Sequence, residues 1–319
     1  MTALAGLTAF VVCWLVLTAL LRRRDGLPMD HPNARSLHTA PTPRIGGVGI
    51  LAGVLAASPW LFAYDVLPIV LGALALAGVS LFDDVRGLSV RVRFLAHFVA
   101  AGAVLLGLAV TGWAWLAGVL AVVWMTNLYN FMDGSNGLAG GMAVIGFGAL
   151  GLAAGWGGAM ELAALCIAIA AAALAFLRFN FPLARLFMGD AGSIPLGFLA
   201  AMIGVAGMHR GLWSGIFPLL VFSPFIVDAS VTLMRRLFAG EKIWQAHRSH
   251  YYQRVILLGA THRQLAVAAW GLMLVMVGLA WVALVWPRHA AGMLILSGVL
   301  YGLLFLIIDL RWQRARHDP

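Results

Sequence analysis

The feature that most limits how this chain can fold is a series of long apolar runs that recurs along the whole sequence. The hydrocarbon core of a bilayer is about 30 Å thick, and a helix needs about 20 apolar residues to cross it. Eleven runs approach that length, at about 3–21, 45–63, 66–82, 93–110, 113–131, 138–155, 159–177, 191–208, 213–233, 264–285 and 290–309. The runs predict an all-α, polytopic transmembrane helical bundle of about eleven helices, with ten as the alternative count, in which 1–319 form a single integral membrane domain.

Composition agrees with a lipid environment, because 62% of the residues are hydrophobic and only 10% are charged. A soluble domain carries about 25% charged residues. This apolar content excludes a nucleic-acid-binding protein, although the net charge is +9. Cys13 and Cys166 lie inside apolar runs without metal-like spacing, so we interpret both as packing residues.

Basic residues are divided unequally between the two sets of loops that eleven spans create. One set, with the C-terminal tail, holds 19 Lys and Arg, and the other holds only Arg210 and Arg288. Since cytoplasmic loops collect Lys and Arg, this division predicts an external N-terminus and a cytoplasmic C-terminus. Arg22–Arg24 follow the first run rather than precede it, so we expect a retained helix and not a signal peptide.

Polar residues that are far apart in sequence all fall on the predicted cytoplasmic side. They are Asp83, Asp84, Asn127, Asn130, Asp133, Asn136, Asp190, His247 and His250. Such a one-sided collection predicts an active site at the inner membrane surface.

Asp83 and Asp84 end the third run, where two adjacent carboxylates repel each other and are costly to bury. Neighbours on a helix diverge by about 100°, so one can face a substrate while the other anchors the helix end through Arg86 or Arg91. A solvated helix terminus without function is the alternative.

Asn127, Asn130 and Asp133 repeat at a spacing of three, which places them on one helix face if the fifth helix continues that far. Amides and a carboxylate on one stripe suit a nucleotide, a sugar or a hydrated metal. Gly134 and Gly137 would then let the chain turn and expose backbone N–H groups to an anion. The alternative is a stripe of hydrogen bonds between helices.

Two further segments carry candidate site residues. Asp190 stands at the start of the eighth run beside free N–H groups, with Ser193 as a cap; helix stabilisation alone is the alternative. In the first basic loop, Arg35 and Arg44 either face phosphate or only set topology, and Gly46-Gly47 allows close approach of another group.

The last large loop carries His247, Arg248 and His250 among six basic residues. Their side chains are hydrogen-bond donors suited to a pyrophosphate. Zinc is disfavoured, because no third histidine or cysteine is near and Arg248 separates the two histidines.

Taken in order, these blocks resemble the polyprenyl-phosphate N-acetylhexosamine-1-phosphate transferases of glycosyltransferase family 4, which initiate peptidoglycan and O-antigen synthesis. The resemblance covers about residues 31–254. It is carried by Pro-Thr-Pro-Arg-Ile-Gly-Gly at 41–47, the Asp83-Asp84 pair, the Asn-x-x-Asn-x-x-Asp-Gly block at 127–134, and Phe-Met-Gly-Asp-x-Gly-Ser at 187–193.

The resemblance implies a role for each matching position. Asp190 corresponds to the magnesium ligand, and Asp83 and Asp84 correspond to the pair that deprotonates or positions the lipid phosphate. The nucleotide-sugar motif maps to Asn127, Asn130 and Asp133, while His247 and His250 match two histidines of the cytoplasmic motif. Asn136 replaces a more common aspartate, and Ser249 replaces a histidine.

The activity implied is transfer of a sugar-1-phosphate from a UDP-sugar to undecaprenyl phosphate at the cytoplasmic face of a bacterial inner membrane, releasing UMP. The expected cofactor is Mg²⁺, with Mn²⁺ as the alternative. The donor sugar stays open between N-acetylglucosamine, N-acetylfucosamine and N-acetylquinovosamine, and an O-antigen-like pathway and a homodimer are further expectations. A flippase for lipid-linked sugars is the rival function. Asp228 is the clearest mid-span ionisable residue for it, with the inner end of the ninth run as the alternative position of this residue.

Overall fold

The protein is a bundle of long helices, seen in a computed structural model that describes residues 1–23, 26–32, 37, 40–61, 66–242, 245 and 247–317. Among these residues, nine helices are long and apolar enough to cross a membrane. They are α1 (Thr2–Arg23), α3 (Leu67–Arg86), α4 (Val90–Gly107), α5 (Gly112–Phe131), α6 (Leu138–Trp156), α7 (Met160–Asn180), α8 (Asp190–His209), α12 (His262–Val285) and α13 (Ala290–His317). The predicted all-α polytopic membrane fold is confirmed.

Two of the eleven apolar runs are not single continuous helices. The second run forms α2 (Gly46–Ala56) and a 3₁₀ turn, η1 (Ser58–Trp60), where Pro59 lacks the N–H that would continue the α-helix. The ninth forms α9 (Ile216–Val221) and α10 (Ser223–Phe238), which separate at Phe222, just before Pro224. In both places, proline interrupts a run whose apolar character is continuous.

Short elements that the sequence pattern did not indicate lie in the polar segments and turns. They are the strands β1 (Met29–Asp30) and β2 (Thr42–Pro43), the helix α11 (Tyr251–Leu257) and the 3₁₀ turn η2 (Pro287–His289). The two strands pair antiparallel, with Met29 opposite Pro43 and Asp30 opposite Thr42. A further bridge joins Arg44 to Phe187, so the first basic segment is fixed to the chain that enters α8.

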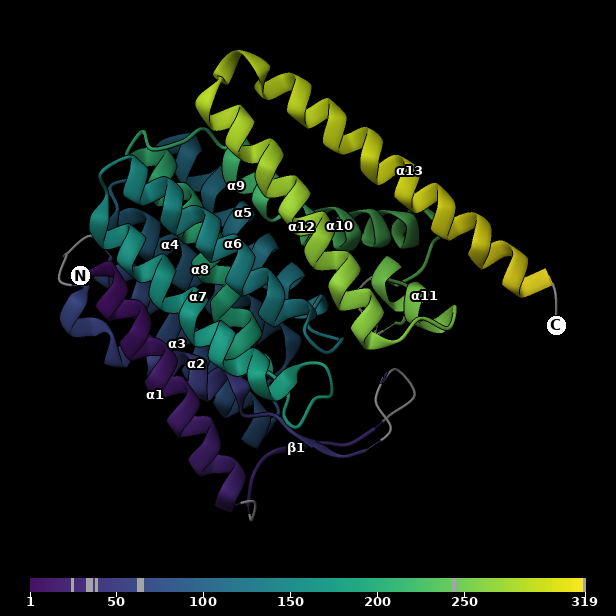
Figure 1. Cartoon of the computed structure of the whole chain (residues 1–319), viewed down its shortest axis with the longest axis horizontal. Coiled ribbons are helices and arrows are strands. Elements are labelled where there is room, and N and C mark those ends of the chain that lie inside the picture. The colour runs from purple at the N-terminus through teal and green to yellow at the C-terminus, as the bar shows by residue number, and fades with distance from the viewer. Residues whose placement is uncertain are drawn as a thin grey trace.

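The helices differ greatly in how far the rest of the protein covers them. For α8, 83% of the apolar window is buried inside the protein, whereas the value for α13 is 17%. Helices α3 and α5 pack on α8, and α1 packs on α7 and α2. Figure 1 shows α13 spreading away from α12 and the main bundle beyond the turn that joins the two helices, so that its far end lies well away from α1.

Glycines bring α2 directly against the start of α8. A Cβ on Gly47 would overlap the backbone of Gly192, and a Cβ on Gly192 would lie 2.6 Å from the Gly47 Cα. The predicted close approach at Gly46-Gly47 therefore exists, and the approaching group is the protein's own backbone. This contact places Arg44, two residues before α2, beside the N-terminus of α8.

Candidate active site

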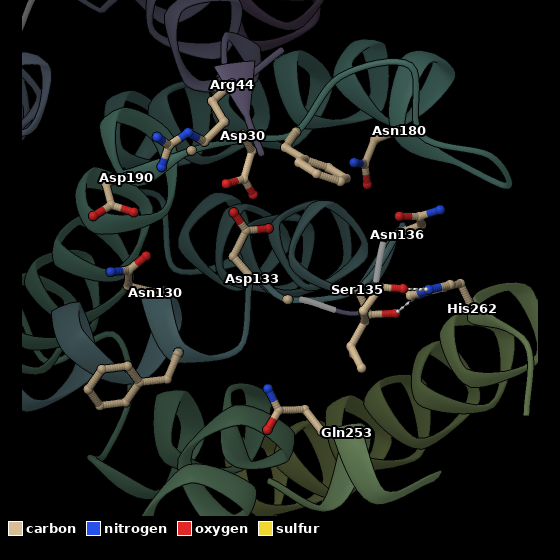
Figure 2. Close-up of a pocket in the computed structure, with 15 residues that line it drawn as sticks. Asp30, Arg44, Asn130, Asp133, Ser135, Asn136, Asn180, Asp190, Gln253 and His262 are labelled. Atoms are coloured by element: carbon tan, nitrogen blue, oxygen red, sulfur yellow. Dashed lines mark hydrogen bonds between the residues drawn. The ribbon is translucent and has the colours of Figure 1, made fainter. Parts of the chain in front are cut away.

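A polar cavity of ≈ 320 Å³ lies where these helix ends and loops meet. Figure 2 shows its polar side chains, with Asp30 and Asp133 pointing toward one another, Arg44 extending between them and Asp190, and Asn130 on the side of Asp190. The lining comprises Asp30, Leu37, Arg44, Asn130, Phe131, Asp133, Gly134, Ser135, Asn136, Asn180, Phe187, Gly189, Asp190, Gln253 and His262. Five predicted polar residues line this cavity, namely Arg44, Asn130, Asp133, Asn136 and Asp190.

Helix and strand ends supply its three carboxylates. Gly189 adopts φ 73°, a left-handed conformation that favours glycine, and α8 begins at the next residue, Asp190. Asp133 follows the C-terminal end of α5, and Asp30 belongs to β1. The pKa of Asp133 is well above its usual range, first because the carboxyl is buried and then because Asp190 and Asp30 repel a charge there. A cation bound in the cavity would therefore favour the charged forms of these carboxyl groups.

Two arginines connect the Asp83-Asp84 pair to this cavity. Nη1 of Arg93 lies 3.1 Å from Oδ2 of Asp83 and 3.9 Å from Oδ2 of Asp190. The Leu88 N–H donates to the other oxygen of Asp83, so both of its carboxylate oxygens have partners. Asp83 thus anchors the end of α3, as predicted for one of the pair, but the prediction of Arg86 or Arg91 as its partner is wrong.

Asp84 is held differently from its neighbour. Its Oδ1 lies 4.0 Å from Nη1 of Arg44, and its side chain is 19% exposed. Arg44 itself lines the cavity, and its Nε is buried without a hydrogen-bond partner among the described residues. One N–H of Arg44 in the cavity wall is therefore not used by the described residues. Arg35, which was predicted to act with Arg44, lies outside the described residues.

The predicted asparagine stripe divides at the end of α5. Asn130 lines the cavity, and its Oδ1 accepts a hydrogen bond of 2.8 Å from the Ser193 hydroxyl. Asn127, one turn earlier, donates to the Val123 carbonyl at 2.7 Å and lies 3.4 Å from Nδ1 of His97, outside the cavity lining. Asn130 thus faces the site, while Asn127 makes hydrogen bonds within the bundle, which was the alternative interpretation.

The predicted cap by Ser193 is wrong, and the predicted exposure of a backbone N–H is wrong at Gly137. The Ser193 hydroxyl donates to Asn130 and to the Gly189 carbonyl, and makes no side-chain cap at the start of α8. The Gly137 N–H donates to Oδ1 of Asn180 at 2.7 Å, so it is already used and is not exposed for an anion. Gly137 does adopt a left-handed φ of 76°, as the predicted turn requires.

His247, Arg248 and His250 do not line the cavity, although two of them lie close to its wall. His250 is 4% exposed, and its ring stacks on Phe131, with 6.2 Å between ring centroids. The rings of His247 and His250 are 4.9 Å apart. Arg248 is exposed. The two histidines therefore adjoin the site through Phe131, while Arg248 stays at the surface.

His247 is neutral at neutral pH. Burial lowers its pKa to about 4, with further contributions from His250 and Arg236. The Ser249 N–H donates to Nδ1 of His247 at 3.3 Å, which places the remaining ring proton on Nε2. His247 can thus donate one hydrogen bond to a phosphate oxygen, but it brings no charge.

Asp228 explains how this loop is held. Its two carboxylate oxygens accept the N–H groups of Tyr251 and Tyr252, each at 2.9 Å, and Oδ1 lies 3.4 Å from Nδ1 of His250. Charge at the N-terminus of a helix satisfies unpaired N–H groups. Asp228 therefore has a structural partner in α11, which removes the residue on which the flippase interpretation depends.

Sequence reasoning missed several residues of the cavity. Asp30, Asn180, Gln253 and His262 all line it, and Nδ1 of His262 lies 2.8 Å from the Ser135 hydroxyl. Asn180 begins the block that leads into the motif at 187–193, and the other three belong to segments without a recognisable motif, so only the fold brings them here. Arg93 belongs to the basic segment after Asp84. It is ten residues from Asp83 in the sequence, so the sequence alone does not indicate that these two residues pair.

The donor set suits a hard cation. Within the described part of the chain, no three His, Cys, Asp or Glu side chains form a metal cluster by themselves. Asp190, Asp133 and Asn130 nevertheless offer oxygen atoms around one cavity, and Mg²⁺ takes one or two carboxylates and keeps several waters. These residues therefore fit Mg²⁺ better than a softer metal.

Apolar spanning helices that carry a cavity of acids, amides and arginines at their ends define a polytopic membrane protein with a phosphate-compatible site. The family model of glycosyl transferase family 4 matches residues 66–208, from α3 to α8. A probable undecaprenyl-phosphate N-acetylglucosaminyl 1-phosphate transferase of Bacillus subtilis is 31% identical over 80% of this chain and 78% of its own length.

Two other similar proteins carry related names. The undecaprenyl-phosphate alpha-N-acetylglucosaminyl 1-phosphate transferase of Escherichia coli K12 is 29% identical over 82% of this chain and 78% of its own length. The decaprenyl-phosphate N-acetylglucosaminephosphotransferase of Mycobacterium tuberculosis is 29% identical over 99% of this chain and 91% of its own. The chain belongs to the polyprenyl-phosphate N-acetylhexosamine-1-phosphate transferase family.

Proposed function

We propose that this protein transfers an N-acetylhexosamine-1-phosphate from a UDP-sugar to undecaprenyl phosphate, releasing UMP. The names of the similar proteins support N-acetylglucosamine as the first donor to test. The excess of basic residues in one set of loops supports a site on the cytoplasmic face of a bacterial inner membrane. The product would begin a lipid-linked, O-antigen-like polysaccharide.

The observation that carries this proposal is that neighbouring residues line two cavities of opposite character. Beside the polar cavity lies an apolar one of ≈ 870 Å³ between α10, α11, α12 and α13. Consecutive residues of the chain line different cavities. Met132 and Tyr252 line the apolar one, and the residues that follow them, Asp133 and Gln253, line the polar one. A substrate with a phosphate on a prenyl chain requires adjacent spaces of these two kinds.

The reaction forms one phosphorus–oxygen bond and breaks another. An oxygen of the lipid phosphate attacks the sugar-linked phosphorus of the donor, and the bond to UMP breaks with its electron pair passing to UMP. Arg44 and Arg93 lie where they can contact the anionic oxygens. Asp83 is fully engaged, so Asp84 is our candidate for receiving a proton from the lipid phosphate or orienting it.

A divalent cation would be held by Asp190 and Asp133, with Asn130 nearby. Mg²⁺ bound there would neutralise charge that develops on the diphosphate. Arg44 helps to hold Asp84 in place, and Arg93 helps to hold Asp190. Asn130, which is held by Ser193, would orient the donor.

The test is UMP release by purified, folded protein supplied with Mg²⁺, undecaprenyl phosphate and a panel of labelled UDP-sugars. We expect UMP with at least one donor, and none when Mg²⁺ is removed by a chelator. Adding Mg²⁺ back should restore release. If folded protein releases no UMP from any donor, the proposed reaction is wrong.

A further inference from the structure

The last helix, α13, reaches the loop beside the site through one acidic residue. Oδ2 of Asp309 accepts hydrogen bonds from Nη1 of Arg235 at 2.6 Å and from the Tyr251 hydroxyl at 3.1 Å. Its other oxygen accepts a hydrogen bond from Nη1 of Arg254 at 2.8 Å. Within the described residues, Asp309 is the acid of α13, and it pairs with two arginines from other elements. A single carboxylate therefore joins α10, α11 and α13.

Aromatic contacts reinforce the same junction. The ring of Tyr251 stacks on Phe305 of α13 with 3.7 Å between centroids, and the guanidinium of Arg254 lies 5.0 Å from the Tyr251 ring. Arg254 also lies 5.8 Å from the ring of Trp312. Stacked rings limit rotation of Tyr251, while the ion pairs fix its hydroxyl end.

From this junction, a continuous set of contacts leads to the polar cavity. Nε of Arg254 donates to the Ser249 carbonyl at 3.0 Å, which fixes the chain between His247 and His250. On the other side of α11, the Tyr252 hydroxyl donates to the Phe131 carbonyl at 3.1 Å, and Gln253 lines the cavity. Helix α11 has only seven residues, and so short a helix depends on external contacts for its order.

We propose that Asp309 is a positioning residue that lets the C-terminal helix hold α11 and the His247–His250 loop against the substrate cavity. Asp309 does not line that cavity and contacts no reacting group; it acts through Arg254 and Tyr251. The consequence for substrate binding depends on the function proposed above, whereas the consequence for α11 does not.

The experiment compares Asp309→Asn, Asp309→Glu and Arg314→Gln in the full-length protein in detergent. Asparagine keeps the size but removes the charge shared by the two arginines. We expect about a tenfold rise in KM for the UDP-sugar, with kcat changed less than about threefold, because α11, which supplies Gln253 to the cavity wall, and the loop before it lose their fixed position. Glutamate should keep KM within about threefold of wild type. Arg314 is exposed farther along α13, so its glutamine variant should match wild type.

Hydrogen exchange gives a second measurement that needs no turnover. In Asp309→Asn, amides of Tyr251–Leu257 should exchange faster than in wild type and Arg314→Gln, while amides of α8 should not change. This comparison remains decisive if the protein releases no UMP. Unchanged exchange in α11, or unchanged KM despite faster exchange, would overturn the proposal.

Tyr251→Phe provides the test if Asp309→Asn does not accumulate as folded protein. It removes only the hydroxyl that contacts Asp309 and Arg235, and keeps the ring stacked on Phe305. We expect the same direction of change in KM and exchange, by about threefold. A phenylalanine variant with wild-type values for both would contradict the role of this junction.

Discussion

The two sides of the polar cavity are constructed in different ways. On the acidic side, Asp83, Arg93 and Asp190 come from α3, α4 and α8, and α8 is the most deeply buried of the spanning helices that the structure describes. On the side that we call basic, the seven-residue α11 supplies Gln253 to the cavity, and His247 and His250 lie just before α11 without lining it. Carboxylates from α10 and α13 hold that segment. One side is fixed by helix packing, and the other by a few polar contacts.

This difference indicates which side of the site must stay fixed during the reaction and which side can move. Charges that must face a transferring phosphoryl group need exact placement, which packed helices supply. A loop that contacts a bulky donor must admit and release it, and segments with few packing contacts open at low cost. Substitutions on the acidic side should therefore reduce kcat, whereas substitutions on the basic side should mainly alter KM.

Asp190→Asn should have the largest effect. The variant keeps the shape at the start of α8 but loses the charge that would bind a cation, so we expect kcat to fall about 100- to 1000-fold. UMP release measured at saturating Mg²⁺ and donor tests this. Thermal unfolding should stay close to wild type, and nearly full kcat in a folded variant would exclude Asp190 as a ligand.

Arg93→Gln should have the second largest effect. It removes the guanidinium that bridges Asp83 and Asp190, so the two carboxylates lose their shared partner. We expect kcat to fall about 10- to 100-fold with KM nearly unchanged. The matched control is Arg91→Gln, since Arg91 is exposed on the same helix. Equal losses in both variants would show that general charge, and not the bridge, matters.

Asp228→Asn should produce a smaller change, on the basic side. An amide can accept one of the two N–H groups of α11, but its NH₂ group faces the other donor. We expect about a tenfold rise in donor KM, faster exchange of α11 amides and a modest loss of stability of about 1–3 kcal/mol. If kcat fell instead while KM stayed constant, the proposed division between the two sides would fail.

The sequence was sufficient to predict the fold class and the gathering of polar groups, because lipid permits long apolar helices and the charges occupy only their ends. It located Asp190, Asp133, Asn130 and Arg44, whose motifs lie at those ends. It could not show that Asp83 pairs with Arg93 rather than Arg86 or Arg91, since the choice depends on how α3 and α4 turn at Gly87.

Other parts of the site depend on tertiary contacts that leave no periodic pattern. Asp228 looked like an ionisable residue within a span, yet it caps a helix that is 23 residues distant in sequence. Asp309 stood at the end of the last apolar run without a motif around it. Gln253 and His262 reach the cavity only because α11 and α12 fold back onto it.

The glycine contact between α2 and α8 sets the spacing of charges in the site. Neither Gly47 nor Gly192 has a side-chain torsion, so the interface cannot relax by choosing another rotamer. Any larger residue at either position must move one whole helix. The contact therefore fixes the distance between the backbones that carry Arg44 and Asp190, and only the side-chain torsions of these two residues can change the spacing of their charges.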